Sequence, residues 1–86
     1  MKIVITPHAE EQMVFRELSR ERVIEVATNP QQIVPASMGR SVAQSRYNVR
    51  GKDYLLRVLI EDRADERWVI TIYPTSKVGK YWRGAA

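Results

Sequence analysis

One histidine and one strand arginine stand out as side chains whose types and positions could do chemistry. His8 is the only histidine in the 86 residues, and no other type of side chain ordinarily changes charge near neutral pH. It falls at the second position of an expected helix, where the positive end of the helix dipole disfavours the protonated imidazole. His8 is therefore a candidate general base. The alternative is an exposed histidine that contacts only its own helical turn.

Arg57 interrupts an otherwise apolar stretch that runs from Leu55 to Ile60. A charge in such a strand reduces its apolar surface, which favours a role on an open sheet face, and the planar guanidinium suits bidentate binding of phosphate. Arg46 is expected on the same face and is a second candidate by the same reasoning. The alternative for both is an exposed arginine paired with an acidic neighbour.

The C-terminal tail, residues 75–83, mixes cations with aromatic rings and contains no acidic residue. The cations are Lys77, Lys80 and Arg83, and the aromatic residues Tyr81 and Trp82 are interleaved with them. Rings beside cations suit the stacked bases and backbone phosphates of single-stranded nucleic acid. The alternative is that the two aromatic residues simply pack on the core.

No metal and no cofactor are predicted. The chain has no cysteine, so neither a thiolate ligand nor a disulfide framework is available. The single histidine with Glu10 and Glu11 beside it is a poor ligand set.

The charge of the chain is unevenly distributed. The net charge is +4 at pH 7, and residues 1–38 carry four Lys/Arg against five Asp/Glu, whereas residues 39–86 carry ten against five. A bias of one sign in one half argues for a basic face and for a nucleic acid, RNA in particular, as the ligand. A surface that serves only solubility is the alternative.

Length and composition fit one domain, residues 1–86, with a thin core. No apolar stretch approaches the roughly 18 residues that a membrane span requires. The first residues reach a polar run too early for a signal peptide. We therefore expect a cytoplasmic protein.

Local patterns predict the elements that must position these residues. A short strand over residues 2–5 precedes a helix that begins at Pro7, behind a threonine cap, and runs to about Arg16. Ser19 caps a second helix, which stops before Pro30 because the residue preceding a proline avoids the helical conformation. The residues expected to face the core are Ala9, Met13, Val23, Val26 and Ala27.

The remaining chain predicts an antiparallel meander, after a short extended piece at residues 32–34. Strand signals occur at Val42–Val49, Tyr54–Ile60 and Trp68–Tyr73, with turns over residues 50–53 and 61–66. Pro74 is expected to end the last strand, because it cannot donate to the ladder. A short tail or helical turn should follow.

The two faces of this sheet can be assigned from the alternation of side chains. The expected pairs are Leu56 with Ile72, Val58 with Ile70, and Ile60 with Trp68, which together build an apolar face under the helices. The same register puts Arg57 beside Thr71 on the opposite face, and a slip by one residue would bury the arginine. The predicted fold is therefore α+β, with two helices on one face of an antiparallel sheet.

Short motifs along this framework carry a family resemblance. In the first half they are Ile5-Thr6-Pro7-His8-Ala9, Glu17-Leu18-Ser19 and Asn29-Pro30; in the second they are Tyr47 to Gly51, Leu55-Leu56-Arg57-Val58 and Val69-Ile70-Thr71-Ile72-Tyr73-Pro74-Thr75-Ser76-Lys77. Over residues 5–83 the chain resembles a bacterial domain family of unassigned function that is grouped with the RelE-like toxins. Those belong to the wider barnase, EndoU, colicin and RelE class of ribonucleases.

The resemblance implies metal-independent RNA cleavage, in which the ribose 2′-OH attacks the adjacent phosphodiester. Such chemistry needs a base for the 2′-OH proton, cations for the phosphorane and a proton donor for the leaving oxygen. RelE-like sites often recruit a C-terminal tyrosine, and Tyr81 is the position that could match. The predicted catalytic group is His8, Arg57 and Tyr81, and the predicted RNA-binding residues are Arg46, Lys77, Lys80 and Arg83. His8 can reach Arg57 only if its helix begins at the edge of the sheet.

Three hypotheses follow from these patterns. The first is an endoribonuclease of the toxin type that a partner antitoxin neutralises. The second is a non-catalytic RNA-binding module on the same scaffold. The third is a protein-interaction domain, including a homodimer formed through a sheet edge or the C-terminal tail.

Overall fold

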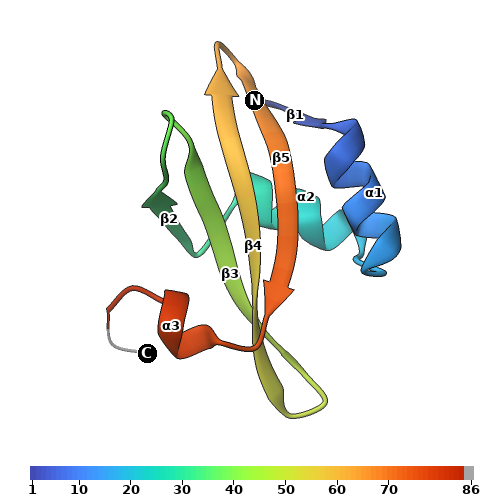
Figure 1. The fold of residues 1–86 in the computed structure, drawn as a ribbon, viewed down its shortest axis with the longest axis vertical. Coiled ribbons are helices and arrows are strands. Elements are labelled where there is room, and N and C mark those ends of the chain that lie inside the picture. The colour runs from blue at the N-terminus through green and yellow to red at the C-terminus, as the bar shows by residue number, and fades with distance from the viewer. Residues whose placement is uncertain (85–86) are drawn as a thin grey trace.

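The structure, a computed structural model, describes residues 1–84 as three helices and a five-stranded sheet in the order β1-β5-β4-β3-β2 (Figure 1). In chain order the elements are β1 Lys2–Ile5, α1 Pro7–Phe15, α2 Arg20–Thr28, β2 Gln32–Pro35, β3 Ser41–Val49, β4 Lys52–Arg63, β5 Glu66–Thr75 and α3 Val78–Tyr81. The α+β class predicted from the sequence is confirmed.

The sheet is mixed, which corrects the expectation of a purely antiparallel one. β2, β3, β4 and β5 pair with their neighbours in antiparallel fashion, but β1 pairs with β5 in parallel. The sequence predicts β1 only as a short strand and assigns it no partner. It joins the sheet because Ile3 and Ile5 pack against the core while its backbone groups bond to β5.

Both long helices begin at the predicted caps. The Thr6 hydroxyl accepts from the amide of Ala9 at 3.2 Å, and the Ser19 hydroxyl accepts from the amide of Arg22 at 3.3 Å. These bonds satisfy amides that the first helical turn leaves unpaired. No helix within residues 1–84 has the length and apolarity that crossing a bilayer would require.

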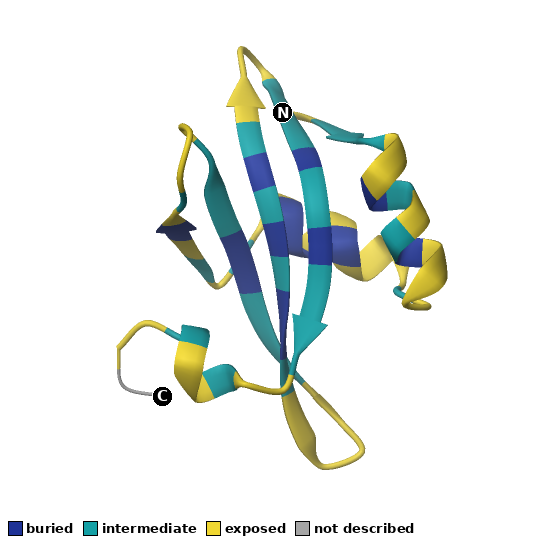
Figure 2. Ribbon diagram, in the orientation of Figure 1, coloured by how far each residue is buried: buried dark blue, intermediate teal, exposed yellow. Residues whose placement is uncertain are grey.

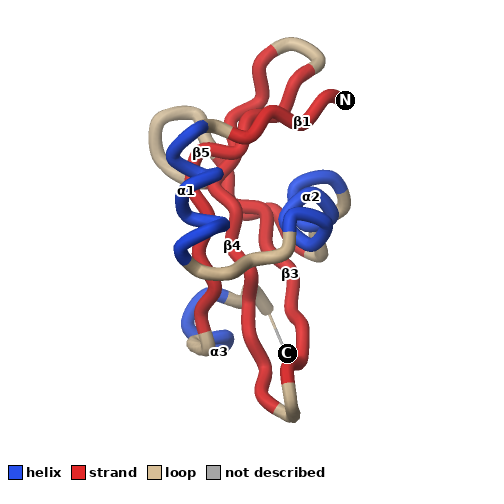
Figure 3. Tube along the Cα trace, turned by 90° about the vertical axis from the view of Figure 1, so that its right-hand side faces the viewer, coloured by secondary structure: helices blue, strands red, loops and turns tan. Residues whose placement is uncertain are grey.

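The two helices occupy different places against the sheet. α2 lies across the back of β3 and β4, whereas α1 runs beside β5 at the edge of the sheet (Figures 1 and 3). The Gln12 side chain of α1 accepts from the backbone amide of Ile72 at 2.8 Å and from the Thr71 hydroxyl at 2.6 Å. α1 therefore closes the edge of β5 beyond the end of β1, and the expectation that both helices lie on one face holds fully only for α2.

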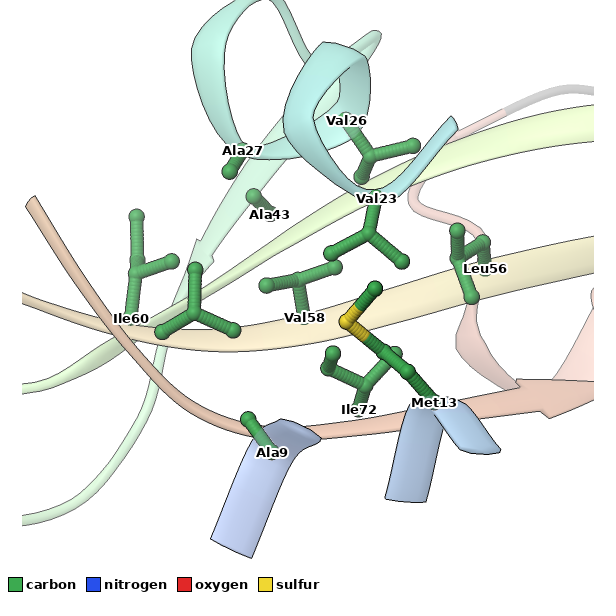
Figure 4. Packing of buried hydrophobic residues seen from close by; sticks show 11 residues of the cluster. Ala9, Met13, Val23, Val26, Ala27, Ala43, Leu56, Val58, Ile60 and Ile72 are labelled. Atoms are coloured by element: carbon green, nitrogen blue, oxygen red, sulfur yellow. The ribbon is translucent and has the colours of Figure 1, made fainter. Parts of the chain in front are cut away.

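One apolar core lies between the two helices and the sheet (Figures 2 and 4). All five helix residues expected to face the core are buried. The sheet residues of the cluster are Ala43, Leu56, Val58, Ile60, Val69 and Ile72. Alanine at positions 9, 27 and 43 lets the helices approach the strands closely, because each has only a methyl group between backbone and core.

The register between β4 and β5 differs from the predicted one. Val58 lies opposite Ile72 rather than Ile70, and Ile60 lies opposite Val69 rather than Trp68. Two features cause this difference. The hairpin turns at residues 64 and 65, which shifts the pairing by one residue, and a β-bulge at Leu59/Ile60 inserts one extra residue of β5 and shifts it by a second. Val69 therefore points into the core, while Trp68 contacts Arg63, whose guanidinium lies 4.2 Å from the indole ring centroid.

The strands are also longer than predicted. The first hairpin turns over only Arg50 and Gly51, both with positive φ of 52° and 84°, as a two-residue turn of the hairpin type requires. Pro74 does not end β5 but pairs with Leu56. It is tolerated because β1 pairs only as far as Val69, so no strand of the described chain needs a hydrogen bond from the proline on that edge.

The core packing yields a stability prediction. Ile72→Ala removes a fully buried side chain from the centre of β5, and we expect it to lower the free energy of unfolding by about 2–5 kcal/mol. Ile33→Ala is the matched control, because Ile33 is half exposed on β2 and its loss should cost roughly 1 kcal/mol or less. Urea denaturation of both variants measures the difference. Equal losses would contradict the described core.

Candidate nucleic-acid interface

Four polar side chains stand in one row across the outer face, the sheet face opposite α2. Gln32 pairs with Gln44, Gln44 with Arg57, and Arg57 with Tyr73, so each lies directly beside the next on β2, β3, β4 and β5. The Gln44 amide donates to Gln32 Oε1 at 2.8 Å. Arg57 donates through Nε to Gln44 Oε1 at 3.0 Å and through Nη1 to the Tyr73 hydroxyl. We call these four residues the polar row.

Gln44 is the buried centre of the polar row, with no exposed surface. Its Nε2 donates both to Gln32 and to the backbone carbonyl of Tyr81, the latter at 3.1 Å, while its oxygen accepts from Arg57. A buried amide without partners would cost about 1–3 kcal/mol. The guanidinium can only donate, so it fixes the orientation of the Gln44 amide.

The C-terminal tail folds back over the polar row. The Arg57 guanidinium lies 4.0 Å from the centroid of the Tyr81 ring. Gln32 Nε2 donates to the Arg83 carbonyl at 2.8 Å, and its Oε1 accepts from the Arg83 amide at 3.1 Å. Figure 3 places α3 and α2 on opposite sides of the sheet. The structure thus brings Arg57 and Tyr81, two of the predicted catalytic residues, into direct contact.

Arg57 is held by neutral partners only. It is partly buried, and no carboxylate within residues 1–84 forms an ion pair with it. The alternative of an acidic neighbour is therefore wrong for Arg57. Its charge is positioned by the polar row and the Tyr81 ring without being neutralised, which suits it to bind an anion.

Arg46 has a different environment from Arg57. Its Nη2 lies 3.4 Å from Asp53 Oδ2, and its guanidinium lies 5.1 Å from the centroid of the Trp82 ring. Hydrogen bonds from Asn48 and from Arg46 lower the pKa of the Asp53 carboxyl. Arg46 is thus paired with an acidic neighbour, which was the alternative to a role in phosphate binding.

The other predicted RNA-binding residues lie on the tail. Lys77, Lys80 and Arg83 are exposed, and none of them forms an ion pair in the described part of the chain. The Lys80 ammonium lies 5.2 Å from the centroid of the Tyr81 ring. Lys80 therefore lies beside the aromatic ring that covers Arg57.

His8 stands apart from Arg57 and Tyr81. It is exposed at the start of α1, and its Nε2 lies 3.5 Å from the Thr71 hydroxyl. Thr71 precedes Tyr73 by two positions on β5, and within residues 1–84 no hydrogen bond connects His8 to the polar row or to Tyr81. α1 does begin at the edge of the sheet, as the predicted catalytic group required, but the structure joins only two of its three members.

Three residues of the polar row, Gln32, Gln44 and Tyr73, were not among the site residues predicted from the sequence. Gln44 alternates with Arg46 along β3, so its place on the outer face could have been read from the strand pattern. Gln32 carried no such signal, because its amide gains a role only when β2 pairs with β3. A neutral partner for an arginine is also harder to recognise than an acidic one.

A pocket of about 490 Å³ opens between α2 and β3. Its charged and aromatic lining consists of Glu21, Arg22, Glu25, Arg46 and Tyr47. The Arg22 guanidinium lies 4.4 Å from the centroid of the Tyr47 ring, and Tyr47 stacks with Tyr54 at 5.9 Å. Burial raises the pKa of Tyr47. In the described part of the chain no three His, Asp or Glu side chains gather into a metal site.

The central role of Gln44 leads to a prediction about the tail. Gln44→Leu should lower the free energy of unfolding by about 1–3 kcal/mol, because it leaves Arg57 and the Tyr81 carbonyl without their partner. In a Trp68→Phe background, the emission of Trp82 should shift to the red as the tail leaves the sheet. Fluorescence and urea denaturation measure the two effects. As a control, Gln44→Leu in a Trp82→Phe background should leave the emission of Trp68 unchanged. If Gln44→Leu does not shift the emission of Trp82, other contacts hold the tail.

Comparison with known proteins places this arrangement in a family. No curated protein and no solved structure matches the chain significantly. A family model described as "Domain of unknown function (DUF4258)" matches residues 5–74. The matched segment contains His8 and the whole polar row, and it ends before α3. The chain therefore belongs to the DUF4258 domain family.

Proposed function

We propose that the protein binds single-stranded RNA on the outer face, with Arg57 holding a backbone phosphate. The observation that carries this proposal is the environment of Arg57: a partly buried guanidinium, oriented by Gln44 and Tyr73, without a carboxylate partner in residues 1–84. Its Nη2 makes no hydrogen bond to the described residues, so it is free to donate to a phosphate oxygen. Because the side chain is already held in place, little conformational entropy is lost on binding.

The surroundings of Arg57 favour RNA over a small anion. Tyr81 and Trp82 offer rings beside the guanidiniums of Arg57 and Arg46. Bases stack on such rings, while cations follow the backbone phosphates. The exposed cations of the tail extend the positive surface beyond the reach of one phosphate.

This proposal predicts a salt-dependent affinity. In fluorescence-anisotropy titrations with a labelled single-stranded RNA, log Kd should rise linearly with log salt, since each phosphate contact on a single strand adds about 0.7 to the slope. Replacing Lys77, Lys80 and Arg83 by alanine together should reduce the slope by about 2. Arg57→Lys keeps the charge but lacks the planar fork, and it should weaken binding at least about 10-fold.

A matched triple variant controls for net charge. Arg16, Arg50 and Lys52 are exposed and form no ion pair within residues 1–84, so replacing them by alanine also removes three charges. We expect this control to change the slope by clearly less than the tail variant does. Equal slopes for the two triple variants, with full affinity in Arg57→Lys, would rule out the outer face as the RNA surface.

A second candidate function is cleavage of the bound RNA by a toxin-type endoribonuclease. The exposure of His8 favours it, because this imidazole is open to solvent at the β5 edge near Thr71, although no hydrogen bond within residues 1–84 connects it to Arg57. In such a reaction His8 would take the 2′-OH proton, Arg57 would stabilise the phosphorane, and Tyr81 would protonate the leaving oxygen. The resemblance to RelE-like toxins also supports it. A neutralising antitoxin would then be expected to cover Arg57.

His8→Ala tests the cleavage function directly. We expect the rate of EDTA-resistant RNA cleavage to fall about 10²- to 10⁴-fold in the variant. If expression of the parent protein arrests cell growth, expression of the variant should not. Its thermal melt should stay close to that of the parent protein, because His8 is exposed and its only side-chain neighbour within hydrogen-bonding range in the described chain is Thr71. If the parent protein binds RNA but does not cleave it in the presence of EDTA, the cleavage function is contradicted and RNA binding remains.

A further inference from the structure

The pocket between α2 and β3 lies where β3 loses its neighbour. β2 pairs with β3 only through Ser41–Gln44, so within residues 1–84 no strand lies beside the edge of β3 beyond Gln44. Gln31 covers part of this edge: its side-chain oxygen accepts from the backbone amide of Arg46 at 2.9 Å, and its backbone amide donates to the Ser45 hydroxyl at 3.1 Å. The pocket therefore opens beside the part of β3 that is not paired with β2.

The lining of this pocket combines flat groups with unpaired charges. The Arg22 guanidinium lies over the Tyr47 ring, and Tyr47 stacks with Tyr54. The plane on which a base can stack is therefore the face of the guanidinium that points away from Tyr47. Glu21 and Glu25 also line the pocket. Within residues 1–84 none of Arg22, Glu21 and Glu25 forms an ion pair, so their hydrogen-bonding capacity is available to a ligand.

Arg46 connects the pocket with the outer face. It lines the pocket, and its guanidinium lies 5.1 Å from the centroid of the Trp82 ring on the tail. Along β3 it follows the buried Gln44 by two positions and so shares its face. A strand of RNA that leaves Arg57 toward β3 therefore meets Arg46 and then the mouth of the pocket.

We propose that this pocket is a base-binding subsite for the same RNA that the outer face holds by its phosphate. This inference rests on the proposed function and deepens it. The volume of about 490 Å³ is in the range of small-ligand pockets. One base stacks on the Arg22 guanidinium, which the Tyr47 ring supports from its other side. Arg46 pairs with Asp53 through Nη2, and its other nitrogens contact the phosphate between this nucleotide and the one at Arg57.

The two carboxylates determine which bases the pocket prefers. An ionised carboxylate only accepts hydrogen bonds, so Glu21 and Glu25 select bases that present an exocyclic amino group. Adenine, cytosine and guanine carry such a group and uracil does not. Oligo(A) and oligo(C) are therefore expected to bind more tightly than oligo(U).

Single-stranded eight-nucleotide RNAs test the subsite by fluorescence anisotropy. Arg22→Ala should weaken binding of oligo(A) about 5- to 150-fold, the range expected for one stacked base. The double variant Glu21→Gln and Glu25→Gln should lower the preference for oligo(A) over oligo(U) at least about 5-fold, because a glutamine amide also donates to the uracil carbonyl. Arg16→Ala is the charge-matched control, since this exposed arginine lies at the end of α1, and it should bind both RNAs like the parent protein.

A series of RNAs with one abasic ribose at successive positions locates the bound base. At one position the abasic RNA should lose as much affinity as Arg22→Ala does, and combining the two should cause no further loss, since both remove the same interaction. Wild-type affinity in Arg22→Ala, together with weak binding by Arg57→Lys, would overturn the subsite and leave the outer face as the RNA surface. Absence of salt-dependent RNA binding by the parent protein would overturn both.

Discussion

The hydrogen bond from Arg57 to Gln44 is the interaction on which the outer face depends. A guanidinium in a sheet needs acceptors, and a carboxylate would supply them but would also cancel the charge. Here a buried amide accepts from Nε and a tyrosine hydroxyl accepts from Nη1. Both partners are neutral, so the position of the side chain is fixed while its charge remains available. Elsewhere in the described chain, acidic side chains pair with Arg40, Arg46, Arg63 and Arg67.

The same amide couples the polar row to the C-terminal tail. α3 has only four residues and no buried side chain, and a helix of that length is not stable by itself. It is held instead by bonds from Gln44 and Gln32 to the backbone of Tyr81 and Arg83, and by the Tyr81 ring over Arg57. The family match contains the polar row but ends before α3. The polar row therefore lies in the segment that matches the family model, whereas α3 with Tyr81 lies outside it.

The bulge in the β4–β5 pair shows how a local irregularity keeps two requirements compatible. Val69 and Ile72 both point into the core although three positions separate them, which a regular strand cannot achieve. The extra residue absorbs the odd spacing, so Val69 packs under the helices while Tyr73 stays on the outer face beside Arg57. Without the bulge, either the core would lose a valine or Arg57 would lose the tyrosine that orients it.

Local signals in the sequence determined the helices and the strand faces. The Thr6-Pro7 and Ser19 starts and the Asn29-Pro30 stop were correct because capping groups act within a few residues. The outward position of Arg57 was correct because strand alternation has a period of two. Only the tertiary structure decided the bulge, the parallel pairing of β1, the separation of His8 from Arg57, and Gln44 as the partner of both Arg57 and the tail. Gln44 and Tyr81 are 37 positions apart, and contacts over such distances depend on how the whole sheet is assembled, which no local pattern encodes.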